Sequence, residues 1–233
     1  MNDTQNKPLA LIVGAGSGLG TSLVNTFAIN GYQVVGLNRT GLDLDVKHDQ
    51  IDYKQVDLAQ HETVIPIIND IVQQYGVPEV VIHNPAQLYI KAFMQTSTDD
   101  FQNAWRSMVL SAIHVLQTVL PAMAQRGSGK VIVSGATASI RGGANFSAFA
   151  SAKFALRGLT QSLAREYQSQ GIHIAHVIID GILDTPRSRE LHAMNPEKMM
   201  LTTDVANTYL QLVQQPLSTW THELDLRPCT ENF

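Results

Sequence analysis

The chain has 233 residues, a length that a single α/β sheet can accommodate around a sizeable core. Hydrophobic residues make up 44% and charged residues 15%, and the formal net charge of -4 argues against a strongly basic surface for nucleic acid. Because Cys229 is the only cysteine, the first residues are polar and the apolar runs are short, we expect a cytoplasmic protein without internal disulfide, signal peptide or membrane span.

Apolar runs of strand length alternate along the chain with segments of helical periodicity. The predicted strands are Leu9–Val13, Gln33–Leu37, Asp52–Val56, Glu79–Ile82, Lys130–Ser134, His173–Ile178 and Trp220–Leu226. The predicted helices are Gly18–Asn30, Ala59–Tyr75, Thr98–Gln125, Ser147–Gln168 and Thr203–Gln214. This alternation is typical of βαβ units, so we expect one α/β domain over residues 1–233, with a doubly wound, seven-stranded parallel sheet and helices on both faces.

Residues that commonly begin or end helices lie between these segments. Gly31, Gly76 and Gly171 follow three of the predicted helices, where a left-handed residue often stops the last turn. Asp57 precedes the second helix as a candidate N-cap. The segment Thr185–Leu201 is the least predictable part of the chain and a candidate for a mobile segment over a site.

A glycine-rich turn lies directly between the first predicted strand and the first predicted helix. Such a turn lets the backbone approach a diphosphate and points free N–H groups and the helix dipole at the anion. A tight turn without a ligand is the alternative, but the flanking strand and helix favour a dinucleotide site of the Rossmann type. The expected contacts are Gly14, Gly16, Ser17, Gly18, Leu19 and Gly20.

The end of the second strand distinguishes the two nicotinamide cofactors. An acid at this place would hydrogen-bond the free adenosine ribose of NAD(H), whereas the sequence has Asn38 and Arg39, both expected contacts. Arg39 can pair with a 2′-phosphate through its planar set of donors, although a solvated loop arginine is the alternative. We therefore expect NADP(H) in preference to NAD(H).

Phe149 and Lys153 open a helical segment in a pattern that resembles the Tyr-x-x-x-Lys motif of the short-chain dehydrogenase/reductase family. The resemblance extends over most of the chain. Four further matches follow in the order of the family. Gly14–Gly20 resembles the TGxxxGxG loop, with Val13 in place of its threonine, and Asp57-Leu58 resembles the adenine-contacting pair. His83–Ala86 lies where the family has Asn-Asn-Ala-Gly, and Asp180–Thr185 resembles the PGxxxT segment without its proline. The resemblance implies a Rossmann oxidoreductase and adds to the cofactor contacts Asp57, Leu58, Asn84, Lys153, Gly181 and Thr185.

The resemblance also implies that most of the catalytic tetrad is replaced. In the family a tyrosine moves the substrate proton, a serine holds the reacting oxygen, a lysine lowers the phenol pKa and grips the nicotinamide ribose, and an asparagine organises a water relay. The corresponding positions here are Phe149, Ala136, Lys153 and Met108. A benzyl side chain has no O–H to donate, so the standard carbonyl mechanism cannot operate, and losing a general acid commonly costs about 10²–10⁴-fold in rate.

Other side chains near the motif are candidates for the missing proton donor. Ser139 and Thr137 are preferred because they follow the fifth strand, at the sheet edge where ligands bind, although such residues more often cap backbone. His83 is a candidate acid or base, with a hydrogen bond to backbone as the commoner role. The remaining hydroxyl candidates are Ser134, Ser147, Ser151 and Tyr89.

No convincing set of metal ligands is present in the sequence. His173 and His176 are three residues apart on a predicted strand and therefore point to opposite faces. We expect no metal site.

Two functions fit these observations. The first is an NADP(H)-dependent oxidoreductase with a non-standard proton donor and an unknown small-molecule substrate. Reduction of an activated C=C bond tolerates the missing phenol better, because a solvent proton can complete it. The second is a catalytically silent NAD(P)(H)-binding sensor or partner protein.

The helices near 98–125 and 147–168 are more apolar than one sheet face requires. In relatives these two helices form the subunit interface, so the resemblance implies a homodimer or homotetramer. Packing within the core is the alternative.

Overall fold

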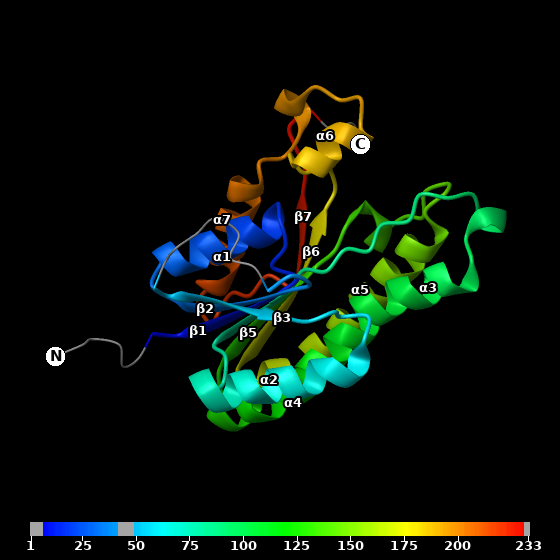
Figure 1. The fold of residues 1–233 in the computed structure, drawn as a ribbon. Coiled ribbons are helices and arrows are strands. Elements are labelled where there is room, and N and C mark those ends of the chain that lie inside the picture. The colour runs from blue at the N-terminus through cyan, green and yellow to red at the C-terminus, as the bar shows by residue number, and fades with distance from the viewer. Residues whose placement is uncertain (1–6, 42–48, 231–233) are drawn as a thin grey trace.

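A seven-stranded parallel sheet forms the centre of the protein (Figure 1). The computed structural model describes residues 7–41 and 49–230. The strand order is β3-β2-β1-β4-β5-β6-β7, and all six neighbouring pairs are parallel. The strands are β1 (Leu9–Val13), β2 (Gln33–Asn38), β3 (Ile51–Gln55), β4 (Val80–His83), β5 (Gly129–Ser134), β6 (Ile172–Ile179) and β7 (Glu223–Leu226). The predicted doubly wound α/β sheet is confirmed.

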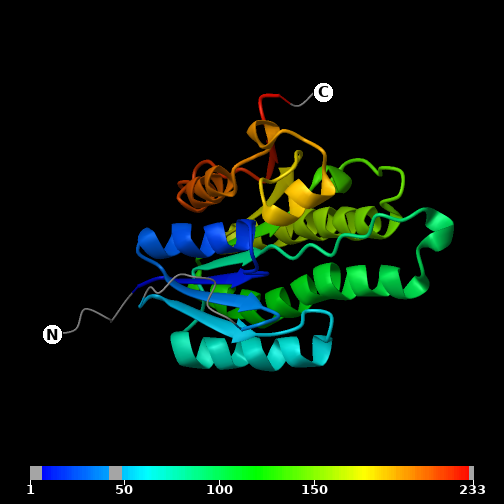
Figure 2. The ribbon, with the colours of Figure 1, turned by 45° about the horizontal axis from the view of Figure 1, so that its top comes forward.

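Helices cover both faces of the sheet. One apolar core lies under α1 (Leu19–Ile29) and α7 (Thr202–Val213). The other lies under α2 (His61–Tyr75), α4 (Ser111–Arg126) and α5 (Ser147–Tyr167). Figure 2 shows α1 and α7 on one side of the sheet, with α2 and α4 on the other. Every residue of β1, β4 and β6 is buried, which explains their largely apolar sequences, in which the polar residues are histidines.

Short helical segments connect these elements. The remaining α-helices of the described chain are α3 (Thr98–Trp105) and α6 (Pro186–Leu191). A π-helical turn, Arg106–Leu110, joins α3 to α4. Single 3₁₀ turns are formed by Phe93–Gln95, Thr137–Ser139, Gln168–Gln170 and Pro196–Lys198.

Three predicted element boundaries are wrong. The helix predicted over Thr98–Gln125 is interrupted by the π turn, whose one extra residue is not recognisable from the apolar pattern of the sequence. Asp57 is not the N-cap of α2: it opens a turn closed by Gln60 N–H, and its Oδ1 accepts from Ala59 N at 3.0 Å. Strand β7 begins three residues later than predicted, because its pairing with β6 starts only at Glu223, opposite His176. Trp220 precedes the strand, and its ring is stacked on His173.

The segment Thr185–Leu201 contains a helix that the sequence analysis did not predict. Thr185 is the N-cap of α6, and its Oγ1 accepts from Ser188 N at 3.1 Å. Farther on, Met200 N donates to Ile182 O, and Asp184 N donates to Met200 O, each at 2.8 Å. These bonds tie both ends of the segment together beside α6. Figure 1 shows α6 beyond the end of the sheet, apart from the helices that cover its faces.

The helical stretch Thr98–Arg126 is long and apolar enough to cross a membrane, which the short apolar runs of the sequence did not indicate. Half of its most apolar window is buried inside the protein. A core helix of this length has the same composition, so these two properties do not by themselves indicate a membrane span.

Most apolar residues on the two helices predicted to contact another subunit pack in the core instead. The fully or almost fully buried ones are Met108, Val109, Ala112, Leu116 and Leu156. Trp105 and Phe154 remain 40% and 45% exposed, and Trp105 Nε1 donates to Ser151 Oγ at 3.1 Å across α3 and α5. The core-packing alternative therefore accounts for most of the apolar pattern, and the homo-oligomer stays a prediction.

The glycine-rich turn allows α1 to start directly against the end of β1. A Cβ atom at Gly20 would lie 2.5 Å from Gly14 O and 2.9 Å from Ala15 C, whereas a Cβ at Gly16 would meet nothing within 4 Å. Only a residue without a side chain fits at Gly20. The head of α1 is thereby held at the carboxyl end of β1.

We predict that Gly20→Ala lowers the free energy of unfolding by about 2 kcal/mol, because backbone must move to admit the methyl group. This value already includes the small gain in helix propensity that alanine brings. Gly16→Ala is the matched control and is expected to leave the free energy of unfolding within about 0.5 kcal/mol of wild type. Urea denaturation of the three proteins measures this. Equal stability of the two variants would contradict the packing argument.

Candidate functional site

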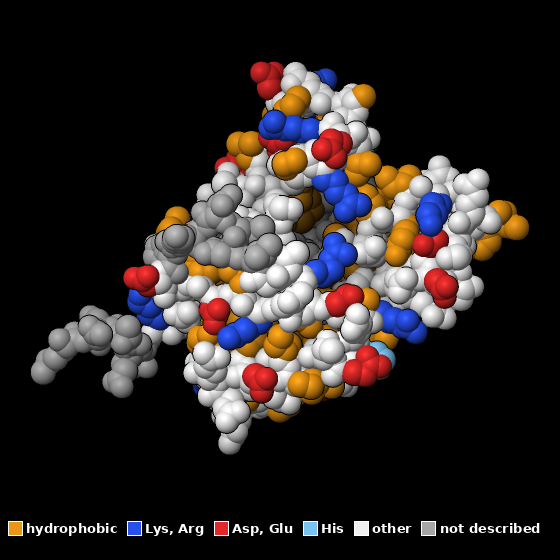
Figure 3. All heavy atoms as spheres, viewed as in Figure 1, with side chains coloured by type: hydrophobic (Ala, Val, Ile, Leu, Met, Phe, Trp, Pro, Cys, Tyr) orange, Lys and Arg blue, Asp and Glu red, His pale blue; other side chains and the backbone are white. Residues whose placement is uncertain are grey.

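A cleft with a volume of about 820 Å³ opens at the carboxyl ends of the strands. It lies where the strand order reverses between β1 and β4, the place at which open α/β sheets bind ligands. In Figure 3 the surface is hollowed beside Lys or Arg side chains. The predicted cofactor contacts that line the cleft are Gly14, Gly16, Ser17, Leu19, Gly20, Asn38, Arg39, Asp57, Leu58, Asn84 and Thr185. The volume is within the range of about 300–1,000 Å³ usual for ligand pockets.

The glycine loop presents free donors to this cleft. Gly14 N and Ala15 N donate to Leu37 O at 3.0 and 2.8 Å, which ties the loop to β2. The backbone N–H groups of Gly16, Ser17 and Gly18 donate to no acceptor in the described part of the chain, and no side chain caps α1. Unsatisfied N–H groups at a helix head fit an anionic group such as a diphosphate.

Arg39 projects into the cleft from the end of β2. Its side chain is exposed and forms no ion pair with any described residue. Asn38 is 8% exposed, and its Oδ1 accepts from Thr40 N at 3.0 Å and from Gly41 N at 2.6 Å. Asn38 thus shapes the turn that carries Arg39.

Two of the predicted cofactor contacts, Gly18 and Gly181, do not line the cleft and are closely packed against neighbouring residues. A Cβ at Gly18 would lie 2.8 Å from Thr185 Cγ2, so the glycine loop touches the start of α6. A Cβ at Gly181 would lie 2.7 Å from Pro228 Cδ and 2.8 Å from Met200 Sδ. Both positions leave no room for a side chain.

Lys153 lies directly behind the cleft wall. Its Nζ donates to Ser134 O at 2.8 Å and to Pro85 O at 3.3 Å, and Pro85 lines the cleft. The side chain is buried, and this burial lowers the lysine pKa to about 8. Two carbonyl acceptors engage two of its three N–H donors.

The three residues that the resemblance places at the other tetrad positions are apolar. The Phe149 ring centroid lies 5.7 Å from Lys153 Nζ, and the ring is 8% exposed. Ala136 packs against the same core cluster as Phe149. Met108, in the π turn, is fully buried, and its Sδ accepts from Gln87 N at 3.5 Å. None of these side chains carries an O–H group.

The candidate hydroxyls are mostly committed to other partners. Ser139 is fully buried, accepts from Ala136 N at 3.2 Å and lies 3.1 Å from His176 Nε2. Thr137 Oγ1 donates to the buried Asp180 carboxylate, which also pairs with Arg227 at 3.0 Å. Among the sequence-derived hydroxyl candidates, Tyr89 is the one on the cleft wall, and its phenol oxygen accepts from Gln87 Nε2 at 3.2 Å.

The histidines near the site are buried and neutral. His83 Nε2 lies 2.9 Å from Ser111 Oγ, so its observed partner is a side chain and not backbone. Burial, with a smaller contribution from Lys153, lowers the His83 pKa to about 3. The described residues hold no group of three or more His, Cys, Asp or Glu side chains placed to bind a metal ion.

Residues 8–196 of the chain match the family described as short chain dehydrogenase. The chain belongs to the short-chain dehydrogenase family. Membership assigns it to a class of oxidoreductases, and the match covers both the glycine loop and the Lys153 helix.

Relatives match this family member over nearly its whole length. An uncharacterised oxidoreductase of Staphylococcus saprophyticus is 24% identical over 240 residues, covering 98% of this chain and 100% of the relative. A short-chain dehydrogenase structure from Rhodopseudomonas palustris has a TM-score of 0.80 and 30% identity, with 96% of this chain and 99% of that one covered. The structure of ElxO with NADP bound has a TM-score of 0.85 and 24% identity, covering 96% and 98%.

Part of the cleft wall was not predicted from the sequence. No motif in the sequence pointed to the α6 part of the wall, which is formed by Pro186, Arg187, Ser188 and Glu190. The adjacent Thr185-Pro186 pair was an available signal, since threonine is a frequent N-cap and proline a frequent first helical residue.

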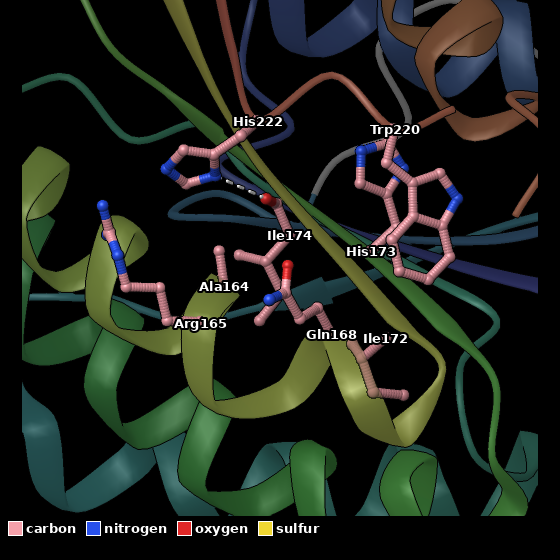
Figure 4. A pocket seen from close by; sticks show the side chains of 8 residues that line it. All are labelled: Ala164, Arg165, Gln168, Ile172, His173, Ile174, Trp220 and His222. Atoms are coloured by element: carbon pink, nitrogen blue, oxygen red, sulfur yellow. Dashed lines mark hydrogen bonds between the residues drawn. The ribbon is translucent and has the colours of Figure 1, made fainter. Parts of the chain in front are cut away.

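A smaller pocket of about 320 Å³ lies at the opposite end of the sheet, beside the starts of β6 and β7 (Figure 4). His222 Nδ1 lies 3.1 Å from Ile174 O, while its Nε2 is buried without a partner in the described chain. Arg165 enters from the end of α5. The pocket is separate from the cleft because parallel strands place their amino and carboxyl ends at opposite edges.

We predict a pH-dependent stability difference between wild type and Lys153→Met. Between pH 8 and 10.5 the unfolded chain keeps a lysine proton that the folded protein releases, so wild-type stability rises with pH relative to the variant. The predicted rise in that difference is about 3 kcal/mol across this window. Denaturant titrations of both proteins from pH 7 to 10.5 measure it. A pH-independent difference would show that Lys153 stays charged.

Proposed function

We propose that the protein is an NADP(H)-dependent oxidoreductase acting on a small molecule. The observation that carries this proposal is the cleft itself, which is lined by the free glycine-loop N–H groups and by the Arg39 guanidinium, none of which has a partner among the described residues. Both are donors suited to phosphate oxygens. The NADP held by ElxO, a relative of the same fold, supports the choice of cofactor. When bound, such a cofactor supplies or accepts a hydride.

Within this proposal the chain's own residues divide the work. The glycine loop holds the diphosphate, Arg39 the adenosine 2′-phosphate, and Lys153 the sugar next to the nicotinamide. Lys153 does not itself line the cleft, but its Nζ lies directly behind Pro85, which does. Two carbonyls orient this Nζ, and its third N–H donor has no acceptor among the described residues, which supports the role. The buried Phe149 ring lies beside Lys153, with its centroid 5.7 Å from Nζ.

The proton donor in this proposal differs from that of the family. Phe149, Ala136 and Met108 occupy the positions at which the family has tyrosine, serine and asparagine. Tyr89 is favoured as the replacement donor over Ser139 and Thr137, because its phenol is on the cleft wall whereas their hydroxyls have buried partners.

A catalytically silent NAD(P)(H)-binding sensor is the second candidate. The apolar surroundings of Lys153 favour this candidate. Of the hydroxyl residues that the sequence suggested as proton donors, only Tyr89 lines the cleft in the described structure. A protein selected only to bind a dinucleotide would keep the loop and the lysine and lose the proton donor.

A cofactor-oxidation screen against ketones, quinones and enoyl compounds separates the two functions. If the protein is an enzyme, we expect turnover of at least one substrate class, and Tyr89→Phe should lower kcat by about 10²–10⁴-fold while leaving NADPH affinity unchanged. Tight NADPH binding without turnover, together with carbonyl reduction gained by the Phe149→Tyr, Ala136→Ser double variant, would favour the sensor. If neither dinucleotide binds at millimolar concentration, both functions are wrong.

Arg39→Ala tests the preference for the phosphorylated cofactor. Removal of a bidentate guanidinium should weaken NADPH binding by about tenfold or more. NADH affinity should stay within about twofold, because NADH carries no 2′-phosphate for Arg39 to bind. Calorimetric titrations of both cofactors measure these changes. Equal wild-type affinities, unchanged in the variant, would remove the preference for NADP(H).

A further inference from the structure

A second arginine of the cleft, besides Arg39, has no partner among the described residues. Arg187, in the first turn of α6, is exposed, lines the cleft and has no hydrogen bond or ion pair among the described residues. Glu190 is one turn farther along α6 on the same wall, yet no ion pair joins the two. The Arg187 guanidinium is therefore available to a ligand.

The neighbouring Arg189 shows the contrast on the same short helix. Its Nε and Nη2 donate to the Asp184 carboxylate at 2.6 and 2.8 Å, a bidentate pair that holds the side chain away from the cleft wall. Arg189 therefore serves the structure of the segment. Of these two arginines on one helix, Arg189 has an internal partner and lies off the cleft, whereas Arg187 lines the cleft and has no partner among the described residues.

The start of α6 is positioned by the glycine loop. Thr185 caps α6, and its methyl carbon fills the space where Gly18 would carry a Cβ, at 2.8 Å from that position. Arg187 is two residues beyond this contact, while Arg39 projects from the end of β2 at another part of the wall. The free N–H groups of Gly16 and Ser17 lie in the same loop as Gly18.

We propose that Arg187 is a binding residue for the diphosphate of the dinucleotide, acting from α6 against the amides of the glycine loop. The inference rests on the proposed function for the presence of a dinucleotide. It assigns the two unpaired arginines to different phosphates: Arg187 to the diphosphate common to both cofactors, and Arg39 to the 2′-phosphate of NADP(H) alone. A guanidinium fits this role because its planar donors can bind two phosphate oxygens at once.

Calorimetric titration of the full-length protein with NADPH and with NADH tests this assignment. Arg187→Ala should weaken the binding of both cofactors equally, by about tenfold. Arg187→Lys, which keeps the charge without the fork, should recover part of that loss. Because Arg187 supplies one phosphate contact, the alanine variant should also show a smaller decrease of affinity with added salt.

Arg189→Ala is the matched control and should change both affinities by no more than about twofold. A thermal melt of each variant shows whether the fold is retained. Unchanged affinities in Arg187→Ala would overturn the proposal, and a loss for NADPH only would overturn the diphosphate assignment by placing Arg187 at the 2′-phosphate. If the wild type binds neither cofactor, the proposed function fails and this inference fails with it.

Discussion

The backbone contact between Gly20 and Gly14 is the constraint on which the cleft depends. It places the first turn of α1 against the end of β1, at a distance that no side chain would permit. The same loop is fastened to β2 through Leu37 O and to α6 through Thr185. The loop thus contacts both β2, the next strand in the chain, and α6, which is more than 140 residues farther on. The cleft lies in the space between them.

Burial sets the chemistry behind this cleft. Lys153 is surrounded by carbonyl oxygens and an aromatic ring instead of carboxylates, so its charge is stabilised only by dipoles. His83 and His176 are also deeply buried, and the pKa of each falls to about 3, which keeps them neutral. The interior around the lysine thus holds few groups able to exchange a proton near neutral pH. This property of the scaffold is compatible with an enzyme that uses a different proton donor and with a protein that only binds the dinucleotide.

The sequence predicts the sheet well because β1, β4 and β6 are buried on both faces and are therefore largely apolar. It predicts the part of the cleft wall that follows β1, β2 and β3, because these residues come directly after strand ends, but it does not predict the part formed by α3, the π turn and α6. It misses α6, since six residues are too few to show helical periodicity. It cannot show that Lys153 is covered by Pro85, a contact between residues 68 apart in the chain.

The π turn at Arg106–Leu110 has a consequence for how this protein can diverge. A π turn closes over one residue more than an α turn, so deletion of a single residue there would restore regular geometry. The preceding helix would then rotate by about 100° relative to α4. Asn103 and Ser107 would leave the cleft wall together, while the sheet and the glycine loop stayed in place. A one-codon deletion could therefore reshape the mouth of the cleft, a change that no point substitution at these positions would reproduce.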